Sequence, residues 1–203
     1  MKYKVDTIGA NIAKELIVKN HHINTQFTCK HAFGLFSNDK IVGVIVYGSP
    51  VGRLTSQSIS DVLENHEVLE LKRLWVINGI SAKTKDFFIN STFNWLKKNT
   101  EVKVLITYTE NSEISLKNLL KRCKWFYQGN DIRLVKSYTH KIFGELYHPR
   151  TACLKFGTTN PYVLKTIDPN YSRIEIPKKD RFIYVLKNKD KVAILSTLKH
   201  PIV

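Results

Sequence analysis

The chain has 203 residues, of which 43% are hydrophobic and 11% are aromatic, so it is long enough to bury a core of its own. Its 32 lysine and arginine residues outnumber its 17 acidic residues and give a formal charge of +15, which favours a polyanionic partner such as nucleic acid over a basic protein that is merely soluble. No apolar run is long enough to cross a bilayer, the start lacks a signal peptide and the three cysteines are too scattered for a metal site, so the sequence predicts a cytoplasmic protein with no membrane partner and no metal.

The first predicted element is a helix. Apolar residues from Ile8 to Ile17 recur at helical spacing, and Asp6 or Thr7 is suited to capping the start of the helix. Two adjacent histidines follow its end, which makes His22 a candidate catalytic base. A solvated helix end is the alternative explanation.

The stretch 33–48 predicts a β-hairpin, because two apolar strands flank a polar turn at 37–40. The glycines and the proline of the following loop, Gly48 to Arg53, predict that it is exposed. Its backbone N–H groups, together with Ser49 and Arg53, could hold an anionic or planar group, although an ordinary turn gives the same pattern.

The polar stretch 54–66 predicts a mobile connection, and residues 68–76 predict a strand of strictly alternating pattern. The alternation places two sets of side chains on opposite faces, one with Leu69, Leu71, Arg73 and Trp75 and the other with Val68, Glu70, Lys72, Leu74 and Val76. Charges on both faces must meet water, a ligand or a paired charge. The strand is therefore either part of a site or an edge strand with a surface ion-pair ladder.

A helix from about Thr84 to Lys98 and an apolar strand at 102–108 come next, and the order strand, helix, strand implies a parallel, right-handed crossover. Either Asn111 or Ser112 then caps a second predicted helix. An aromatic strand follows at 125–129.

The C-terminal part is less regular. Residues 138–150 mix aromatic and basic side chains, which suits binding to DNA, although an ordinary loop has the same composition. Residues 162–167 and 182–187 predict late strands. The sequence therefore predicts a core at 1–135 and a basic, aromatic extension at 136–203 that packs on the same domain.

The order of these elements resembles that of GNAT-type acyltransferases, and several motifs resemble those of Mom-type phage DNA-modification proteins. These motifs are Asp39 to Val51, Glu70 to Val76, Leu105 to Tyr108, Tyr127 to Gly129 and Lys178 to Phe182. The resemblance implies an α/β (α+β) fold with a mixed, strongly bent central sheet flanked by helices, and a β-rich C-terminal extension.

The same resemblance implies a function. Such proteins add a carbamoylmethyl or related acyl-type group to the exocyclic amine of adenine in phage DNA, which protects the DNA from host restriction enzymes in the host cytoplasm. The implied partners are double-stranded DNA and a small-molecule group donor, and an oligomer is possible. The basic charge and the charged strand ends, read from the residues alone, agree with a DNA partner.

The candidate site residues fall into three groups. The catalytic candidates are His22, Glu70, Arg73 and Tyr127. The substrate-binding candidates are Tyr47, Ser49, Arg53, Lys72, Tyr108 and Glu110. The DNA-binding candidates are His148, Arg150, Lys178, Lys179 and Arg181. The resemblance places Leu120 where the family has a tyrosine, which leaves proton delivery to Tyr127, His22, Glu70 or Glu110.

The donor is not identified by the sequence. An acyl-CoA is one candidate, but the loop after the charged strand, Asn78 to Lys83, holds a single glycine where GNAT enzymes carry a glycine-rich pyrophosphate loop. Two other functions stay open: a GNAT N-acetyltransferase acting on a small amine or protein, and a non-catalytic DNA-binding module.

Overall fold

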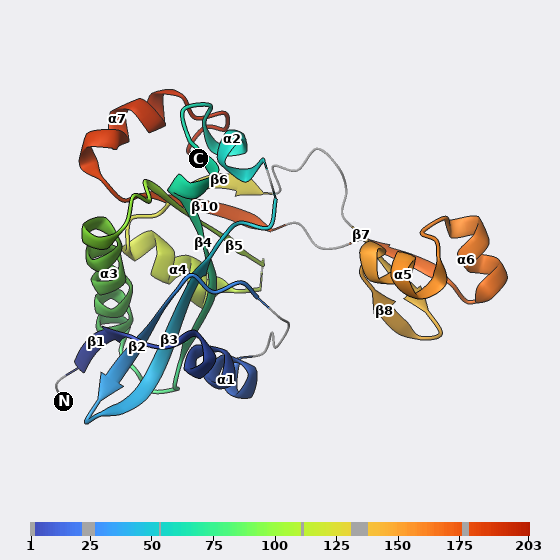
Figure 1. The fold of residues 1–203 in the computed structure, drawn as a ribbon, viewed down its shortest axis with the longest axis horizontal. Helices are drawn as coiled ribbons and strands as arrows, with labels where there is room; N and C mark the ends of the chain where they lie inside the picture. Colours follow the sequence, from blue (N-terminus) through green and yellow to red (C-terminus); the bar gives the residue numbers. More distant parts are fainter. Residues whose placement is uncertain (1–2, 22–26, 53, 111, 131–137, 176–178) are drawn as a thin grey trace. The chain divides into compact units, whose positions relative to one another are not determined.

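The computed structural model describes residues 3–21, 27–52, 54–110, 112–130, 138–175 and 179–203. The chain divides into two compact units, one made of residues 1–130 with 180–203 and the other of residues 131–179 (Figure 1). Residues 180–203, which the sequence boundary at 135 placed in the extension, thus belong to the first unit.

The first unit is built on a seven-stranded sheet with the strand order β1-β2-β3-β4-β5-β10-β6. Its strands are β1 (Tyr3–Thr7), β2 (His31–Ser37), β3 (Lys40–Gly48), β4 (Val68–Val76), β5 (Val104–Thr109), β6 (Phe126–Asn130) and β10 (Asp180–Val185). Neighbouring strands are antiparallel except for β4 and β5, which are parallel as the predicted crossover requires. The mixed sheet confirms the predicted fold class.

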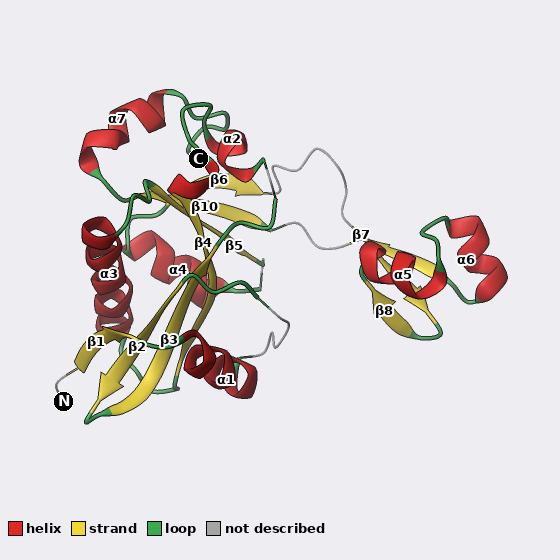
Figure 2. Cartoon of the chain, viewed as in Figure 1, coloured by secondary structure: helices red, strands yellow, loops and turns green. Residues whose placement is uncertain are grey.

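Helices cover both faces of this sheet (Figure 2). They are α1 (Ala10–Asn20), α2 (Thr55–Ile59), the 3-10 helix η1 (Asn65–Glu67), α3 (Ala82–Asn99), α4 (Ile114–Arg122) and α7 (Asn188–Ser196). Phe88 and Phe93 of α3 and Leu120 of α4 pack with Leu69 and Phe182 in the largest core cluster. The opposite face is covered by α1 on one side and by α2 and α7 on the other.

Three local predictions need correction. Strand β1 precedes the first helix, which starts after Gly9 without a side-chain cap. Residues 54–66 contain α2 and the start of η1 rather than a mobile connection. Residues 162–167 lie in helix α6 (Pro161–Ile167), because Asn160 caps the helix and Pro161 fits its first turn.

Strand β4 carries a β-bulge that changes which way its side chains point. Val46 and Tyr47 of β3 pair with Arg73 and Leu71, so Lys72 is an extra residue on β4. Before the bulge Leu69 and Leu71 face the α3 side, and after it Leu74 and Val76 do so, while Trp75 packs on the α1 side. The predicted alternation through Trp75 was therefore wrong beyond Lys72.

The second unit contains a three-stranded antiparallel sheet with the order β8-β7-β9. Its elements are β7 (Tyr138–Ile142), β8 (Glu145–Tyr147), α5 (Pro149–Phe156), α6 and β9 (Ser172–Glu175). Ile142, Tyr147, Ala152, Leu164 and Tyr171 form its small core.

Candidate active site

The candidate site lies in the sheet of the first unit, where β4 and β5 separate. The parallel pairing joins Val68–Glu70 to Val104–Ile106 and then stops, although both strands continue. The hydroxyl of Thr107 donates to the carbonyl oxygen of Leu71 at 3.2 Å just beyond the last pair. The bulge at Lys72 follows immediately, as bulges often do beside active sites.

Glu70 and Lys72 form an ion pair at this point. The Lys72 ammonium lies 2.6 Å from a Glu70 carboxylate oxygen, and their side chains are only 5% and 16% exposed, respectively. The pair is largely buried, which excludes the surface ion-pair ladder. A buried pair of this kind contributes little net stability, because desolvation offsets the attraction between the charges.

Arg73 is the next residue and completes this charged cluster. Its Nη1 donates to the carbonyl oxygen of Lys72 at 2.7 Å, and its guanidinium carbon lies 5.2 Å from the centre of the Phe27 ring. Burial lowers the pKa of Arg73 and the Glu70 carboxylate opposes this shift. Arginine stays charged in either case, so the cluster offers a cation beside a carboxylate and an aromatic ring. Sequence reasoning missed Phe27, because no pattern links it to Arg73.

Gly48 explains how Phe27 reaches this place. The segment after Phe27 runs along the end of β3, where Lys30 donates its backbone N–H to the Tyr47 carbonyl at 2.8 Å and the Thr28 hydroxyl donates to the Ser49 carbonyl at 3.3 Å. A Cβ on Gly48 would lie 2.2 Å from the Thr28 carbonyl oxygen. Only glycine therefore allows the two chain segments to pass.

Two predicted contact residues are core residues instead. Tyr47 is fully buried and its hydroxyl is hydrogen-bonded to that of Thr92 at 2.7 Å, so it does not face a substrate; burial raises its pKa. Arg181 is 3% exposed, and its guanidinium donates to Gln128 at 2.8 Å and to the hydroxyl and carbonyl oxygens of Ser58 at 3.1 and 3.2 Å. It ties β10 to β6 and α2 and is not available to a DNA phosphate.

Tyr127 faces the other side of the sheet from Glu70. It packs against the core cluster on the α3 side, and its hydroxyl donates to Asp180 at 2.9 Å, while Lys117 pairs with the second oxygen of that carboxylate. Burial and the hydrogen bond to Asp180 raise the pKa of Tyr127. The structure thus separates two of the predicted catalytic residues. Sequence reasoning missed Lys117 as a partner of Asp180.

The remaining candidates lie in several places. Tyr108 is 36% exposed on β5, opposite Arg181 in the strand register. Glu110 follows β5, and its backbone N–H donates to the Glu113 carboxylate at 2.7 Å. His148 and Arg150 are exposed at the start of α5 in the second unit, where the ring of His148 accepts from the Arg150 backbone at 3.2 Å.

Lys179 is half-buried at the end of the second unit. His22, Arg53 and Lys178 lie outside the described residues.

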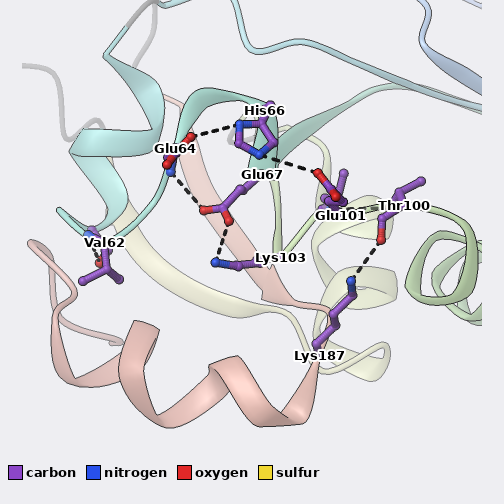
Figure 3. A network of polar contacts seen from close by, with 10 residues as sticks. Val62, Glu64, His66, Glu67, Thr100, Glu101, Lys103 and Lys187 are labelled. Atoms are coloured by element: carbon purple, nitrogen blue, oxygen red, sulfur yellow. Dashed lines mark hydrogen bonds and ion pairs between the residues drawn. The ribbon is translucent and has the colours of Figure 1, made fainter.

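A polar network lies at the N-terminal ends of β4 and β5, away from the charged cluster (Figure 3). Glu67 pairs with Lys103 at 2.5 Å and also accepts from the Glu64 backbone at 3.0 Å, while Lys187 donates to the Thr100 carbonyl at 2.9 Å. A cavity of about 400 Å³ beside this network is lined by Glu67, Glu101, Lys103, Lys187, Lys189 and Asp190. None of the predicted site residues lines this cavity, and two of its charged residues, Glu67 and Lys103, pair with each other.

The comparison with known protein families identifies the chain. A model of the Mom protein family matches residues 2–202. The chain belongs to the Mom protein family. The Mom-like motif Glu70 to Val76 is therefore the bulged strand with the charged cluster, and the motif ending at Val51 contains the glycine that contacts Thr28.

Solved structures with the same fold as this Mom-family chain are acetyltransferases of the GNAT type. An N-acetyltransferase from Staphylococcus aureus Mu50 has a TM-score of 0.52 and 14% identity over 92% of this chain and 99% of that chain. NAA60 of Arabidopsis thaliana in complex with acetyl-CoA has a TM-score of 0.56 and 8% identity over 91% and 98%. An acetyltransferase of the GNAT family from Streptococcus pneumoniae has a TM-score of 0.51 and 9% identity over 92% and 100%.

At these identities the likeness establishes the GNAT fold. No curated protein matches the sequence. The described residues contain no group of three or more metal-ligating side chains and no helix long and apolar enough to span a bilayer.

The start of α3 in this Mom-family chain is where the sequence resemblance places a donor's pyrophosphate. The Ser81 hydroxyl caps the helix by accepting from the Thr84 backbone at 3.1 Å, and the first turn holds no acidic residue. Gly79 has φ +85°, and a Cβ there would meet nothing within 4 Å, so the loop is not a tight glycine cradle. The residues fit a phosphate-bearing donor through the N–H groups and dipole of the helix start.

Proposed function

We propose that this chain transfers a carbamoylmethyl or related acyl-type group to the exocyclic amine of adenine in DNA. The observation that carries the proposal is the charged cluster of Glu70, Lys72 and Arg73 at the bulge where β4 leaves β5, in a chain of the Mom family. A buried charged cluster in a strand motif of that family supports a catalytic role better than a structural one, because it adds little stability.

The proposed reaction has three requirements. The amine nitrogen forms a bond to the transferred carbon, the bond from that carbon to the donor's leaving group breaks with its electron pair, and one amine proton is released. Glu70 is the carboxylate in the cluster and is suited to accept that proton. Arg73 supplies a planar fork of donors that can orient the donor or its departing negative charge.

With Glu70 as the proton acceptor, Tyr127 has no role in the proposed reaction. Its hydroxyl donates to Asp180 and its ring lies on the α3 side of the sheet, whereas Glu70 alternates with Leu69 and Leu71 and so projects to the opposite face. Tyr108 projects to the same side as Glu70, because it is two residues beyond Ile106, the parallel partner of Glu70. We assign it to the substrate-binding surface, together with Ser49, which follows the end of β3.

For an acyl-type group the proposed donor is a CoA thioester, whose carbonyl carbon is transferred while its thiolate departs; a carbamoylmethyl group requires a phosphate-bearing donor with the leaving group on the methylene carbon. An acyl-CoA would place its phosphates at the start of α3, near Lys83, and supply the activated group. The α3 residues named above would bind and orient it.

The proposed acceptor is duplex DNA in the cytoplasm of a phage-infected host. The net charge of +15 supports a polyanion, and the exposed His148 and Arg150 with Lys179 are the proposed phosphate contacts. The exocyclic amine of adenine takes part in base pairing, so the base must leave the stack before it can react.

Mass spectrometry of nucleosides tests the function directly. DNA is isolated from bacteria that express the protein and is digested to nucleosides, with an Arg73→Lys variant as the inactive comparison. The proposal predicts a new modified deoxyadenosine with the parent protein only. Unmodified DNA together with acetyl-CoA-dependent acetylation of amines would instead identify an N-acetyltransferase.

A further inference from the structure

The turn between β7 and β8 is built from unusual residues. Phe143 and Gly144 connect the strands and both have positive φ angles, of +51° and +80°. A two-residue hairpin turn with positive φ at both positions favours asparagine, aspartate or glycine, and a bulky side chain in this region is strained. Gly144 meets the requirement, whereas Phe143 does not.

A buried carboxylate holds Phe143 in this conformation. Asp168 is 3% exposed, and one of its oxygens accepts from the Phe143 backbone N–H at 2.6 Å while the other accepts from the Asn170 N–H at 2.9 Å. The backbone of the hairpin tip is therefore fixed to the segment that follows α6.

Burial of the ring does not explain the choice of phenylalanine, because Phe143 is 64% exposed. Leu146, on β8 just beyond the turn, is 63% exposed, and Lys141 on β7 is also exposed. Residues 131–179 contain nine lysines and arginines against four acidic residues. An exposed aromatic ring thus stands on a held backbone at the tip of a hairpin in a basic unit, and backbone strain of this kind is often found at functional sites.

We propose that Phe143 is a wedge that enters the base stack of duplex DNA and opens the helix at the adenine to be modified. An apolar ring replaces part of the stacking that the opened step loses, and a braced backbone keeps the ring from folding away on contact. The surrounding cations supply the attraction to the phosphates. The inference rests on the proposed function, and it assigns the second unit the task of opening the duplex.

The variant Phe143→Asn tests the wedge without endangering the fold, because asparagine accepts positive φ more readily than phenylalanine. The probe is a set of duplexes that each carry a single 2-aminopurine in place of an adenine. The fluorescence of 2-aminopurine rises when it leaves the base stack. The parent protein should raise the fluorescence of at least one duplex, and Phe143→Asn should lose most of that rise. Phe143→Trp should retain it. Leu154→Gln, which removes another exposed apolar side chain of the same unit, should behave as the parent.

Four results would overturn the wedge. A full fluorescence rise with Phe143→Asn would show that the ring is not needed. A lower melting temperature of Phe143→Asn would show that the ring packs inside the protein. If the parent protein binds none of the duplexes, the proposed function fails and the wedge fails with it, whereas DNA binding without any fluorescence rise overturns the wedge alone.

Discussion

Two arginines of the first unit, Arg73 and Arg181, look equally functional in the sequence and differ in the structure. Each lies in a stretch that resembles a motif of the Mom family. Arg181 is 3% exposed and its donors meet Gln128 and Ser58, whereas Arg73 stacks on Phe27 within a charged cluster at the end of the β4–β5 pairing. The comparison teaches that the partners of a charged side chain, rather than its residue type or motif, distinguish a structural role from a site role.

The largest effect on stability is expected from Arg181→Leu. The change leaves buried acceptors on Gln128 and Ser58 without their donor, and we expect the free energy of unfolding to fall by about 3 kcal/mol in chemical denaturation. The salt dependence of DNA binding by the folded variant should match the parent. A stable variant with a shallower salt dependence would return Arg181 to the DNA surface.

Arg73→Lys, in contrast to Arg181→Leu, should reduce activity and leave stability unchanged. We expect it to fold and melt like the parent but to lose roughly 100-fold in the rate of DNA modification, because lysine keeps the charge and loses the planar fork. Arg122→Lys is the matched control, since it makes the same change at the Asp86 ion pair between α3 and α4. Modification at the parental rate by Arg73→Lys would make β4 a scaffold and direct the search to the loop after Gly48.

Gly48→Ala tests whether activity depends on the position of Phe27 beside Arg73. The new Cβ would displace the Thr28 backbone, so we expect a loss of about 2 kcal/mol in stability and a further loss of modification measured at a temperature where the variant is folded. Gly52→Ala is a milder change in the same loop, because its Cβ would meet only the side chain of Thr55. Equal stability of the two variants would contradict the close passage at Gly48.

The DNA surface can be separated from the buried Arg181 by salt titration. Replacing Arg150 and Lys179 with glutamine should reduce the slope of log affinity against log salt by up to about two units, roughly 0.9 for each phosphate contact. The stability of the first unit should not change. An unchanged slope would remove these two residues from the proposed DNA surface.

The smallest effect is expected in the pH dependence of stability of the second unit, where His140 is buried and His148 is exposed. Burial lowers the pKa of His140, and the nearby Arg173 and His148 lower it further. The His140 ring is hydrogen-bonded to Tyr171. Because its folded pKa lies below the unfolded value of about 6.5, the unfolded chain binds more protons, and the second unit should lose stability as the pH falls below about 6.5. Hydrogen exchange of the second unit at pH 7.5 and 5.5 measures the loss. His148→Asn should leave this dependence almost unchanged.

The periodic elements of the core were predictable because their signals are local. The hairpin turn at Asn38 and Asp39, the helix α3 and the crossover between β4 and β5 follow from residue types and spacings that act within a few positions. The motifs also indicated the family and the charged strand. The second unit was less predictable, since Pro161 and Asn160 outweighed the β-branched residues of α6.

The sequence by itself determined the mixed α/β class, the Mom-like motifs and the basic charge, and it predicted Glu70, Lys72 and Arg73 as site residues. Tertiary structure alone decided the bulge at Lys72, the burial of Tyr47 and Arg181, the placement of Tyr127 with Asp180 and the stacking of Phe27 on Arg73. The physical reason is that burial and pairing depend on residues far apart in the chain. A pattern of alternating residues specifies a strand, but only its neighbours specify where an extra residue breaks the alternation and which charges remain accessible.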